Sequence, residues 1–320
     1  MKAAIRRKYC SPSQLKIEQV EIPVENYNEV LIKVYTTTVN RTDCAVLTAK
    51  PFIMRFFLGF FKPKKVIVGT DFAGEVISVG KNVTSFNKGD RVFGFSDAGS
   101  ESQAEYLVTV AENIFAIPMN IDFKQAAASL EGAHYAFSFE HKADIKSGQN
   151  VFINGATGAI GSALLQFVKQ YNVTITATCD TKNIERIKGL GADRVVDYTK
   201  EDFTKGNDRY DFIFDTVGKS TFRKCKPLLN ANGVYISSEL GPYAQIFFYP
   251  LLTSWSSKKV IFPIPFNKNK TIPYISKLLE QLKFKPIVDR EYNLADIAKA
   301  YAYVVKGQKI ENVIITVANN

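Results

Sequence analysis

The chain has 320 residues, 46% of them hydrophobic and 22% charged, which predicts a globular protein of one or two domains with a sizeable core. Its four cysteines lie far apart without C-x-x-C spacing, which argues against a zinc cluster or a disulfide framework and favours a reducing compartment. The net charge of +10 is spread along the chain, so nucleic-acid binding is not expected as the main role; a basic surface also suits a phosphorylated cofactor or anionic lipid.

The first third of the chain predicts a small β-barrel. Short apolar stretches separated by glycine and asparagine are typical of strands joined by turns. Such stretches cover residues 29–36, 74–80, 90–95 and 104–110.

Residues 51–61 are unusually aromatic and include five phenylalanines. The segment is too short to span a bilayer, which needs about 20 apolar residues, and Arg55 interrupts it. Two interpretations are open: a helix docked on the core, or an apolar flap over a substrate cleft. Because neither a membrane span nor a signal peptide is expected, the chain is predicted to be cytoplasmic.

A glycine-rich turn follows the apolar run at residues 151–154, and an apolar stretch of helical periodicity covers residues 163–168. Strand, glycine turn and helix in this order are what a pyrophosphate-binding unit requires, because the backbone must approach the phosphates and a helix N-terminus attracts the anion. The G-x-x-G-x-x-G spacing departs from the common G-x-G-x-x-G, so an ordinary tight turn is the alternative. The candidate phosphate-binding residues are Gly155, Ala156, Thr157, Gly158, Ala159, Ile160 and Gly161.

Strands and helices alternate from here on, which predicts a parallel sheet whose ligands bind at the carboxyl ends of the strands. Residues at such ends include Asn154, Thr178, Val217, Gly218, Leu240 and Gly241. Strands are expected at residues 173–179, 194–196, 210–215, 233–237, 287–291 and 312–317, and helices at 123–130, 272–282 and 294–305.

Several stretches carry a resemblance to a known family: residues 39–43, 69–76, 88–94, the glycine turn, 189–193, 195–198 and 311–317. In this order they resemble the medium-chain dehydrogenase/reductase superfamily, and more closely its zinc-free quinone oxidoreductase branch. The resemblance covers nearly the whole chain. It implies an α/β protein with a GroES-like, β-rich catalytic domain at residues 1–120 and 266–320. A Rossmann domain with a doubly wound parallel sheet is expected between them, at residues 121–265.

The resemblance also bears on zinc. Zinc-containing members place a cysteine where this chain has Asn40 and a histidine where it has Thr70, and neither replacement is a reasonable zinc ligand. The run of four cysteines that forms a structural zinc lobe is missing, and His134 is expected to be packed. No metal site is therefore expected. Reduction of a conjugated acceptor is favoured over simple alcohol oxidation, which needs a Lewis acid.

The cofactor is expected to be NADPH, with NADH as the less favoured alternative. By similarity, the acid that would hold the ribose hydroxyls of NAD is replaced by Thr178, and Lys182 resembles the family's phosphate-contacting lysine. Tyr198 matches a tyrosine that packs near that phosphate. Asp180 would repel a phosphate, although it also suits the cap of the following helix. Asn312 resembles a tail residue near the cofactor.

Asn40 and Asp43 are the candidate catalytic residues, in a loop that faces the nicotinamide in relatives. Asn40 would donate a hydrogen bond to the substrate or the carboxamide, and Asp43 would orient the loop or relay a proton. Both residue types are also ordinary in turns, so a purely structural role is equally open.

Together these features predict an NADPH-dependent reductase of quinones or α,β-unsaturated carbonyls, with a hydrophobic small molecule as substrate. The alternatives are a zinc-independent alcohol dehydrogenase, an enoyl-thioester reductase, or a non-catalytic NADPH-binding protein that regulates a partner or binds RNA. A homodimer joined through the apolar edge at residues 258–262 is a further expectation, because such an edge needs covering.

Overall fold

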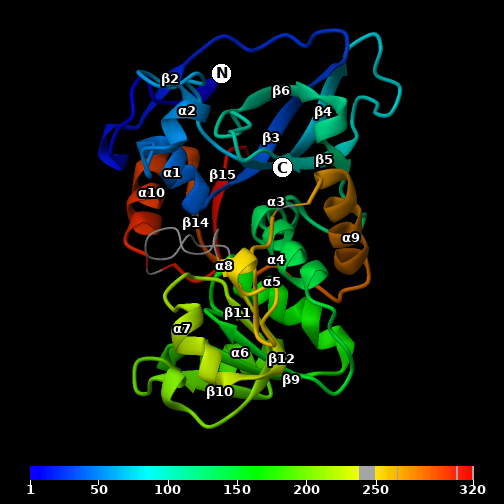
Figure 1. The fold of residues 1–320 in the computed structure, drawn as a ribbon. Helices are drawn as coiled ribbons and strands as arrows, with labels where there is room; N and C mark the ends of the chain where they lie inside the picture. Colours follow the sequence, from blue (N-terminus) through cyan, green and yellow to red (C-terminus); the bar gives the residue numbers. More distant parts are fainter. Residues whose placement is uncertain (238–248, 265, 308, 319–320) are drawn as a thin grey trace. The chain divides into compact units, whose positions relative to one another are not determined.

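The computed structural model describes residues 1–237, 249–264, 266–307 and 309–318, and its chain divides into two compact units (Figure 1). The first unit comprises Met1–Glu131, Ile272–Gln281 and Lys285–Asn320. The second comprises Gly132–Thr271 and Leu282–Phe284. The chain therefore leaves the first unit, forms the second, and returns to the first.

The first unit is built on a seven-stranded sheet in the order β14-β15-β3-β4-β5-β7, with β6 paired to β3. The pairs are antiparallel except for β14 with β15. The strands are β3 (Glu29–Val39), β4 (Asp71–Val79), β5 (Arg91–Phe95), β6 (Tyr106–Val110), β7 (Phe115–Ala116), β14 (Val288–Asn293) and β15 (Asn312–Thr316). A separate antiparallel pair is formed by β1 (Lys2–Ile5) and β2 (Lys16–Gln19).

Helices cover this sheet, and two others cross the boundary between the units. α10 packs against α1 and β3, and α3 packs against β3 and β4. The helices of the first unit are α1 (Arg41–Thr48), α2 (Met54–Leu58), α3 (Phe123–Ala128) and α10 (Ile297–Val305). α4 (Glu131–Lys142) and α9 (Lys268–Glu280) each begin in one unit and end in the other.

The second unit contains a six-stranded, fully parallel sheet in the order β10-β9-β8-β11-β12-β13. Counted along the unit, this is the order 3-2-1-4-5-6 of a doubly wound sheet, and it reverses between β8 and β11. The strands are β8 (Asn150–Asn154), β9 (Thr174–Cys179), β10 (Arg194–Asp197), β11 (Tyr210–Asp215), β12 (Leu229–Ser237) and β13 (Lys259–Ile261).

Short helices connect these strands. α5 (Ala159–Val168) packs on β8, α6 (Ile184–Leu190) on β9 and β10, and α7 (Phe222–Cys225) on β12, while α8 (Tyr249–Leu252) contacts β13. α5 buries Leu164, Leu165 and Phe167 completely, and β8 buries Phe152 and Ile153, which as neighbours in a strand point to opposite faces of the sheet. Continuous burial of this kind is expected for parallel strands that are covered on both faces.

The predicted α/β class is confirmed, and the predicted strands lie within a few residues of the observed ones. One prediction was wrong: the loop expected around Asp43 is helix α1, which begins directly after Asn40. The pair β1 and β2 was not predicted, because residues 1–28 show no strong apolar alternation.

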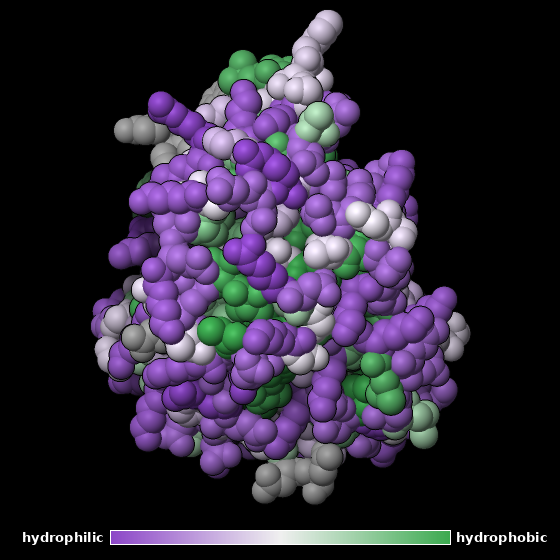
Figure 2. Space-filling model, turned by 90° about the horizontal axis from the view of Figure 1, so that it is seen from below, coloured by the Kyte–Doolittle hydropathy of each residue, from purple (hydrophilic) through white to green (hydrophobic). Residues whose placement is uncertain are grey.

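No helix among the described residues is long and apolar enough to cross a membrane. Figure 2 shows one face of the molecule, on which hydrophilic side chains predominate and hydrophobic ones form patches interrupted by them. Apolar side chains scattered in this way are ordinary on a protein surface and indicate no particular function.

A close approach between β3 and β4 requires glycine at position 74. A Cβ atom added there would lie 2.2 Å from the carbonyl oxygen of Lys33. We therefore expect Gly74→Ala to lower the free energy of unfolding by about 1–3 kcal/mol through overpacking, as measured by urea denaturation. Gly189→Ala is the matched control: its Cβ would meet nothing within 4 Å, and alanine favours helix α6. Equal stability of the two variants would contradict this account.

Candidate functional site

The glycine turn joins β8 to α5 and is shaped by close packing at two of its three glycines. Gly155 has a φ of +88°, and a Cβ there would lie 2.4 Å from Val217 Cγ1. A Cβ on Gly161 would lie 2.3 Å from the carbonyl oxygen of Gly155. Gly158 differs, because its added Cβ would meet only the Gly155 oxygen, at an ordinary 3.5 Å. Packing therefore explains Gly155 and Gly161 but not Gly158, which is the N-cap residue of α5.

The turn between Gly155 and Gly158 is closed by a backbone hydrogen bond of 3.0 Å, and α5 begins at Ala159. Ala156 is fully buried and its N–H donates to the carbonyl of Thr178, so it faces the protein interior. Thr157, Ala159 and Ile160 are partly exposed. The expected turn residues thus fall into an inward-facing and a solvent-facing group.

A hydrogen-bonded network holds this turn at the point where the strand order reverses. Asn154 ends β8 beside Asp215, which ends β11, and the Asn154 Nδ2 donates to Asp215 Oδ1 at 3.0 Å. Thr178 at the end of β9 donates to Asn154 Oδ1 and accepts from the N–H of Gly155, both at 2.8 Å. The Thr178 side chain is completely buried, so its hydroxyl is engaged inside the protein rather than at the surface.

Asp215 also organises the loop after β11. Its carboxylate accepts from the N–H groups of Gly218 and Ser220, both at 3.0 Å, and from the hydroxyl of Tyr235 at 2.9 Å. Gly218 has a φ of +64°, and the side chain of Val217 lies against Gly155. Val217 and Gly218 therefore lie beside the glycine turn. The other two residues expected at this edge, Leu240 and Gly241, lie outside the described residues.

Asp180, Lys182 and Tyr198 follow the ends of β9 and β10. The backbone N–H of Tyr198 donates to the carbonyl of Cys179 at 3.1 Å, and Asp180 is near enough to contribute to the raised pKa of the Tyr198 phenol, for which burial is the larger cause. Lys182 is exposed and forms no ion pair within the described part of the chain. These three side chains thus form one solvent-accessible group at the carboxyl edge of the sheet.

The Asp180 carboxylate accepts from the side-chain amide of Asn183, and the residue precedes the short 3₁₀ turn Thr181–Asn183. Asp180 occupies the N-cap position of this turn, but its carboxylate accepts no capping hydrogen bond from a backbone N–H among the described residues, so the expected side-chain cap is not formed. Asp197, which the sequence did not single out, accepts from the hydroxyls of Thr181 and Thr199, and these bonds lower its pKa to about 2. The ionised Asp197 fastens the end of β10 to this loop.

In the first unit, Asn40 and Asp43 form a reciprocal cap at the start of α1. The N–H of Asp43 donates to Asn40 Oδ1 and the N–H of Asn40 donates to Asp43 Oδ2, both at 2.9 Å. The Asn40 side-chain nitrogen donates to Thr70 Oγ1 at 3.0 Å and to Asp71 Oδ2 at 3.2 Å. Both predicted residues are buried, so the structural role that the sequence left open is present.

Three carboxyl groups gather near Asn40, namely those of Asp43, Asp71 and Glu131, and we call them the acidic cluster. Burial raises the pKa of Asp43 to about 8. Burial and the charge of Asp43 raise the pKa of Asp71 well above its usual range, and burial with the charge of Asp71 does the same for Glu131. The Glu131 carboxylate accepts from the hydroxyl of Thr42. Shifts in this direction favour the protonated form of a carboxyl group.

Asp43 and Asp71 each have a buried Oδ1 with no hydrogen-bond partner among the described residues. The Oδ2 of Asp71 accepts from Thr38 Oγ1 at 2.8 Å. Lys309 lies in the same region: burial lowers its pKa, and the charge of Glu131 opposes that effect. Its ammonium donates to the carbonyl of Glu311, a buried residue with a φ of +63°.

The positions that correspond to zinc ligands do not suit a zinc ion. Asn40 and Thr70 are bonded to each other, and an amide and a hydroxyl are poor zinc ligands. Within the described residues, no three His, Cys, Asp or Glu side chains are grouped as metal ligands would be. The prediction for His134 is confirmed: its ring is buried, bonds to Thr271 Oγ1 at 2.7 Å, and has its pKa lowered by burial to about 4.

Asn312 begins β15 in the first unit, and its side chain is used locally. Its Nδ2 donates to the carbonyl of Ile287 at 3.1 Å, and its N–H donates to the same oxygen at 3.3 Å. The residue is only partly buried. The described contacts therefore give Asn312 a role in holding the start of β15 to the segment before β14.

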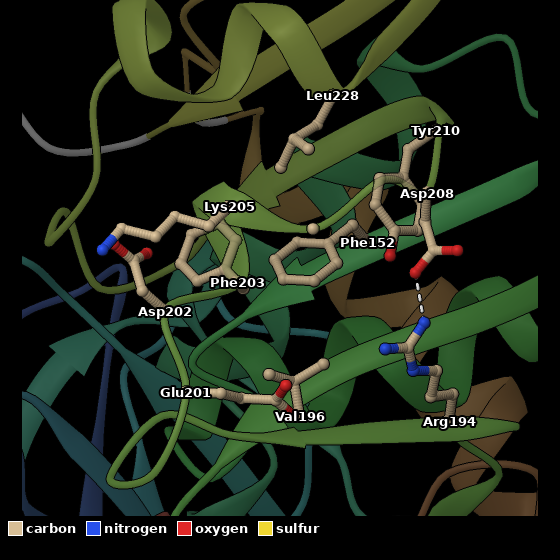
Figure 3. A pocket seen from close by; sticks show the side chains of 11 residues that line it. Phe152, Arg194, Val196, Glu201, Asp202, Phe203, Lys205, Asp208, Tyr210 and Leu228 are labelled. Carbon is tan, nitrogen blue, oxygen red and sulfur yellow. Dashed lines mark hydrogen bonds and ion pairs between the residues drawn. The ribbon is translucent and has the colours of Figure 1, made fainter.

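A cavity of about 300 Å³ in the second unit lies apart from all of these residues (Figure 3). It is lined by the first residues of two strands, Arg194 and Tyr210, and by the loop that contains Phe203, whereas the glycine turn follows the last residue of a strand. Arg194 and Asp208 form an ion pair at its rim, and Phe152 and Phe203 stack in its interior with ring centroids 4.7 Å apart. It is not the candidate site.

Sequence reasoning missed Asp71, Glu131, Asp197 and Lys309, and did not recognise Asp215 as the centre of a network. Asp71 had a signal, since an acid at the start of an otherwise apolar strand is unusual. The other residues become informative only through partners that lie far away in the sequence, such as Thr42 for Glu131.

Two family models match the chain. A model described as "Alcohol dehydrogenase GroES-like domain" matches residues 26–119, and one described as "Zinc-binding dehydrogenase" matches residues 190–315. The first falls within the antiparallel sheet unit and the second spans the later part of the parallel sheet and the returning tail.

Curated relatives cover nearly all of the chain. It is 28% identical over 310 residues to the chloroplast envelope quinone oxidoreductase homolog of Arabidopsis thaliana, covering 93% of this chain and 92% of that protein. It is also 28% identical over 328 residues to the NADPH-dependent alkenal/one oxidoreductase of Arabidopsis thaliana, covering 98% of this chain and 79% of that protein.

Among solved structures, the quinone oxidoreductase from Coxiella burnetii superposes with a TM-score of 0.88 over 99% of both chains at 24% identity, which shows a shared fold. The two sheets of the fold and the names of the curated relatives indicate the same superfamily. The chain belongs to the medium-chain dehydrogenase/reductase superfamily, in its quinone oxidoreductase-like branch.

Proposed function

We propose that this protein is a zinc-independent, NADPH-dependent oxidoreductase that reduces quinones or α,β-unsaturated carbonyl compounds. The curated relatives named as quinone and alkenal/one oxidoreductases support this substrate class. The poor fit of Asn40 and Thr70 to zinc supports reduction of a conjugated acceptor rather than simple alcohol oxidation. Residues 1–120 and 266–320 are assigned as the catalytic domain and residues 121–265 as the cofactor domain.

The observation that carries the proposal is Gly158. It stands at the N-terminus of α5, at the switch point of the parallel sheet, and no contact within the described part of the chain requires a glycine there. The first N–H groups of a helix have no partner within the helix and favour an anion. A side chain at position 158 would fill the space in front of them, so its absence suits a pyrophosphate.

Residues of the second unit would hold the dinucleotide. The turn from Gly155 to Gly161 would receive the pyrophosphate, and Val217 and Gly218 would form the adjacent wall. Lys182 is the proposed partner of the 2′-phosphate, because its ammonium is exposed and free of any ion pair among the described residues. When bound, the cofactor supplies the hydride from its nicotinamide ring.

Reduction of a conjugated acceptor also consumes a proton, and the acidic cluster is suited to hold one. The raised pKa values of Asp43, Asp71 and Glu131 favour the protonated form of these carboxyls. Asn40 is proposed to be positioned by Asp43 and to present its amide beside Asp71. The catalytic assignment of Asn40 and Asp43 is thus a proposal about orientation and hydrogen bonding rather than metal chemistry.

Turnover tests the proposed activity directly. Purified protein should oxidise NADPH in the presence of benzoquinones or short enones, and prior treatment with a metal chelator should leave the rate unchanged. The loss of NADPH absorbance measures both results. Absence of turnover with every acceptor, or complete loss of activity with chelator, would refute the proposal. Preferential oxidation of simple alcohols would indicate an alcohol dehydrogenase instead, and preferential reduction of enoyl thioesters would indicate an enoyl-thioester reductase.

Replacing Gly158 tests the site of pyrophosphate binding. Gly158→Val should weaken dinucleotide affinity by about 1.4 kcal/mol or more, which is at least tenfold, while circular dichroism and thermal unfolding stay close to those of the wild type. Titration of cofactor fluorescence measures the affinity. Gly189→Val is the control, since its side chain would point into open space away from the turn. Unchanged affinity of Gly158→Val would remove the turn from the site.

Replacing Lys182 tests the preference for NADPH. Lys182→Ala should weaken NADPH by about 2–3 kcal/mol, because a charge-assisted contact is lost, and should affect NADH far less. Dissociation constants for both cofactors measure the difference. Lys188→Ala removes another lysine from the same segment and should affect neither cofactor. An equal loss for NADPH and NADH in Lys182→Ala would show that the phosphate is held elsewhere.

A further inference from the structure

The segment around α2 exposes an unusual number of large apolar side chains in a short stretch of chain. Its leucine, Leu58, is buried and anchors it, whereas most of its other large apolar side chains face solvent. We call the exposed ones the aromatic patch: Phe52, Ile53, Phe56, Phe57, Phe60 and Phe61, with exposed fractions of 58%, 59%, 64%, 74%, 45% and 89%.

The aromatic patch is held in place by specific contacts. Gly59 has a φ of +118°, and its missing side chain admits the carbonyl oxygen of Lys62, which would lie 2.1 Å from an added Cβ. The Tyr9 hydroxyl donates to the carbonyl of Gly59 at 2.5 Å, and the Arg55 guanidinium lies 5.0 Å from the Tyr9 ring. The turn after α2 is thus fixed to the first unit and brings Phe60 back against the helix.

The rings of the aromatic patch contact one another while staying exposed to solvent. Phe60 makes edge-to-face contacts with Phe52, Phe56 and Phe61, at centroid distances of 5.9, 5.5 and 5.0 Å. The cluster is therefore preformed, and its solvent-facing side has no cover among the described residues. An exposed apolar cluster of this size is a common mark of an interaction surface.

The segment that carries the aromatic patch has charges of one sign. Residues 50–66 contain four lysines and one arginine and no acidic residue. Lys50, Lys62 and Lys64 are exposed, while Lys65 pairs with Glu101. A preformed apolar cluster with a basic rim is the combination that binds the headgroup region of an anionic bilayer, through apolar burial and electrostatic attraction together.

We propose that the aromatic patch docks the protein reversibly on the surface of anionic lipid membranes. The phenylalanine rings would enter the boundary between headgroups and acyl chains while the lysines stay among the lipid phosphates. The docking does not depend on the proposed reaction, and it requires no spanning helix.

Two other occupants fit the aromatic patch less well. A second copy of the chain, related by two-fold symmetry, would bring the same lysine rims face to face and repel itself. A single-stranded nucleic acid would need open ring faces for base stacking, and the edge-to-face contacts among Phe52, Phe56 and Phe60 cover part of them. Charge complementarity and ring packing both favour lipid.

Vesicle sedimentation with the full-length protein tests the proposal. Vesicles of phosphatidylcholine with about one third phosphatidylglycerol should carry the wild type down, and pure phosphatidylcholine vesicles should carry far less. Raising the salt concentration should weaken binding. The double variant Phe57→Asp/Phe61→Asp should lose at least about tenfold in the partition constant, and Lys62→Glu/Lys64→Glu should lose the preference for anionic vesicles.

The matched control is Val24→Asp/Met119→Asp, which adds the same charge at two apolar side chains of the first unit that are 81% and 91% exposed but lie outside the aromatic patch. It should bind vesicles more than the patch variant does. Circular dichroism and cofactor titration check that each variant is folded. Failure of the wild type to bind anionic vesicles would overturn the proposal, as would equal losses in the control. If the wild type does not bind vesicles but forms a dimer that the patch variant loses, the aromatic patch binds a second copy of the chain. If the wild type does not bind vesicles but binds RNA in a salt-sensitive way, the aromatic patch binds nucleic acid.

Discussion

The second unit depends on the hydrogen bond between Asn154 and Asp215, which joins two strand ends at the point where the parallel sheet reverses its order. The Asp215 carboxylate also accepts a hydrogen bond from the N–H of Gly218 in the loop after β11. Asn154 Oδ1 accepts from the hydroxyl of Thr178, which lies on the strand at the other side of β8. Three strand ends are thus fixed to one another through fully hydrogen-bonded polar side chains. A turn supported in this way is held in one conformation, which would lower the entropy cost of binding the proposed dinucleotide.

The first unit differs in that it buries several carboxyl groups close to one another. Asp43 and Asp71 are buried, Glu131 contributes to the raised pKa of Asp43, and Oδ1 of both aspartates has no partner among the described residues. Buried charges without partners are costly, so burial favours the protonated form of these groups. The side chains of Asn40, Thr70 and Asp71 are joined by hydrogen bonds at this place.

Sequence reasoning succeeded where a feature is local. The glycine turn, the alternating strands and helices, and the packed His134 all follow from neighbouring residues, and each was predicted from them. It failed where the decisive partner is distant. Asn40 and Asp43 look like turn residues until Thr70 and Asp71 are placed beside them, and Glu131 looks like a helix-starting acid until Thr42 lies against it. The exposure of the aromatic segment depends on Gly59 and Tyr9, which lie 50 residues apart in sequence.

Glu311 adopts a backbone conformation that glycine takes freely and that costs other residues about 1–2 kcal/mol. Its carbonyl accepts from the ammonium of Lys309, its side chain is completely buried, and its charge contributes to the pKa of Lys309. A change of Glu311 to glycine would relieve this backbone cost, but it would also leave a cavity at a completely buried position and remove a carboxyl group near Lys309. Backbone conformation, core packing and local charge therefore favour different residues at this position.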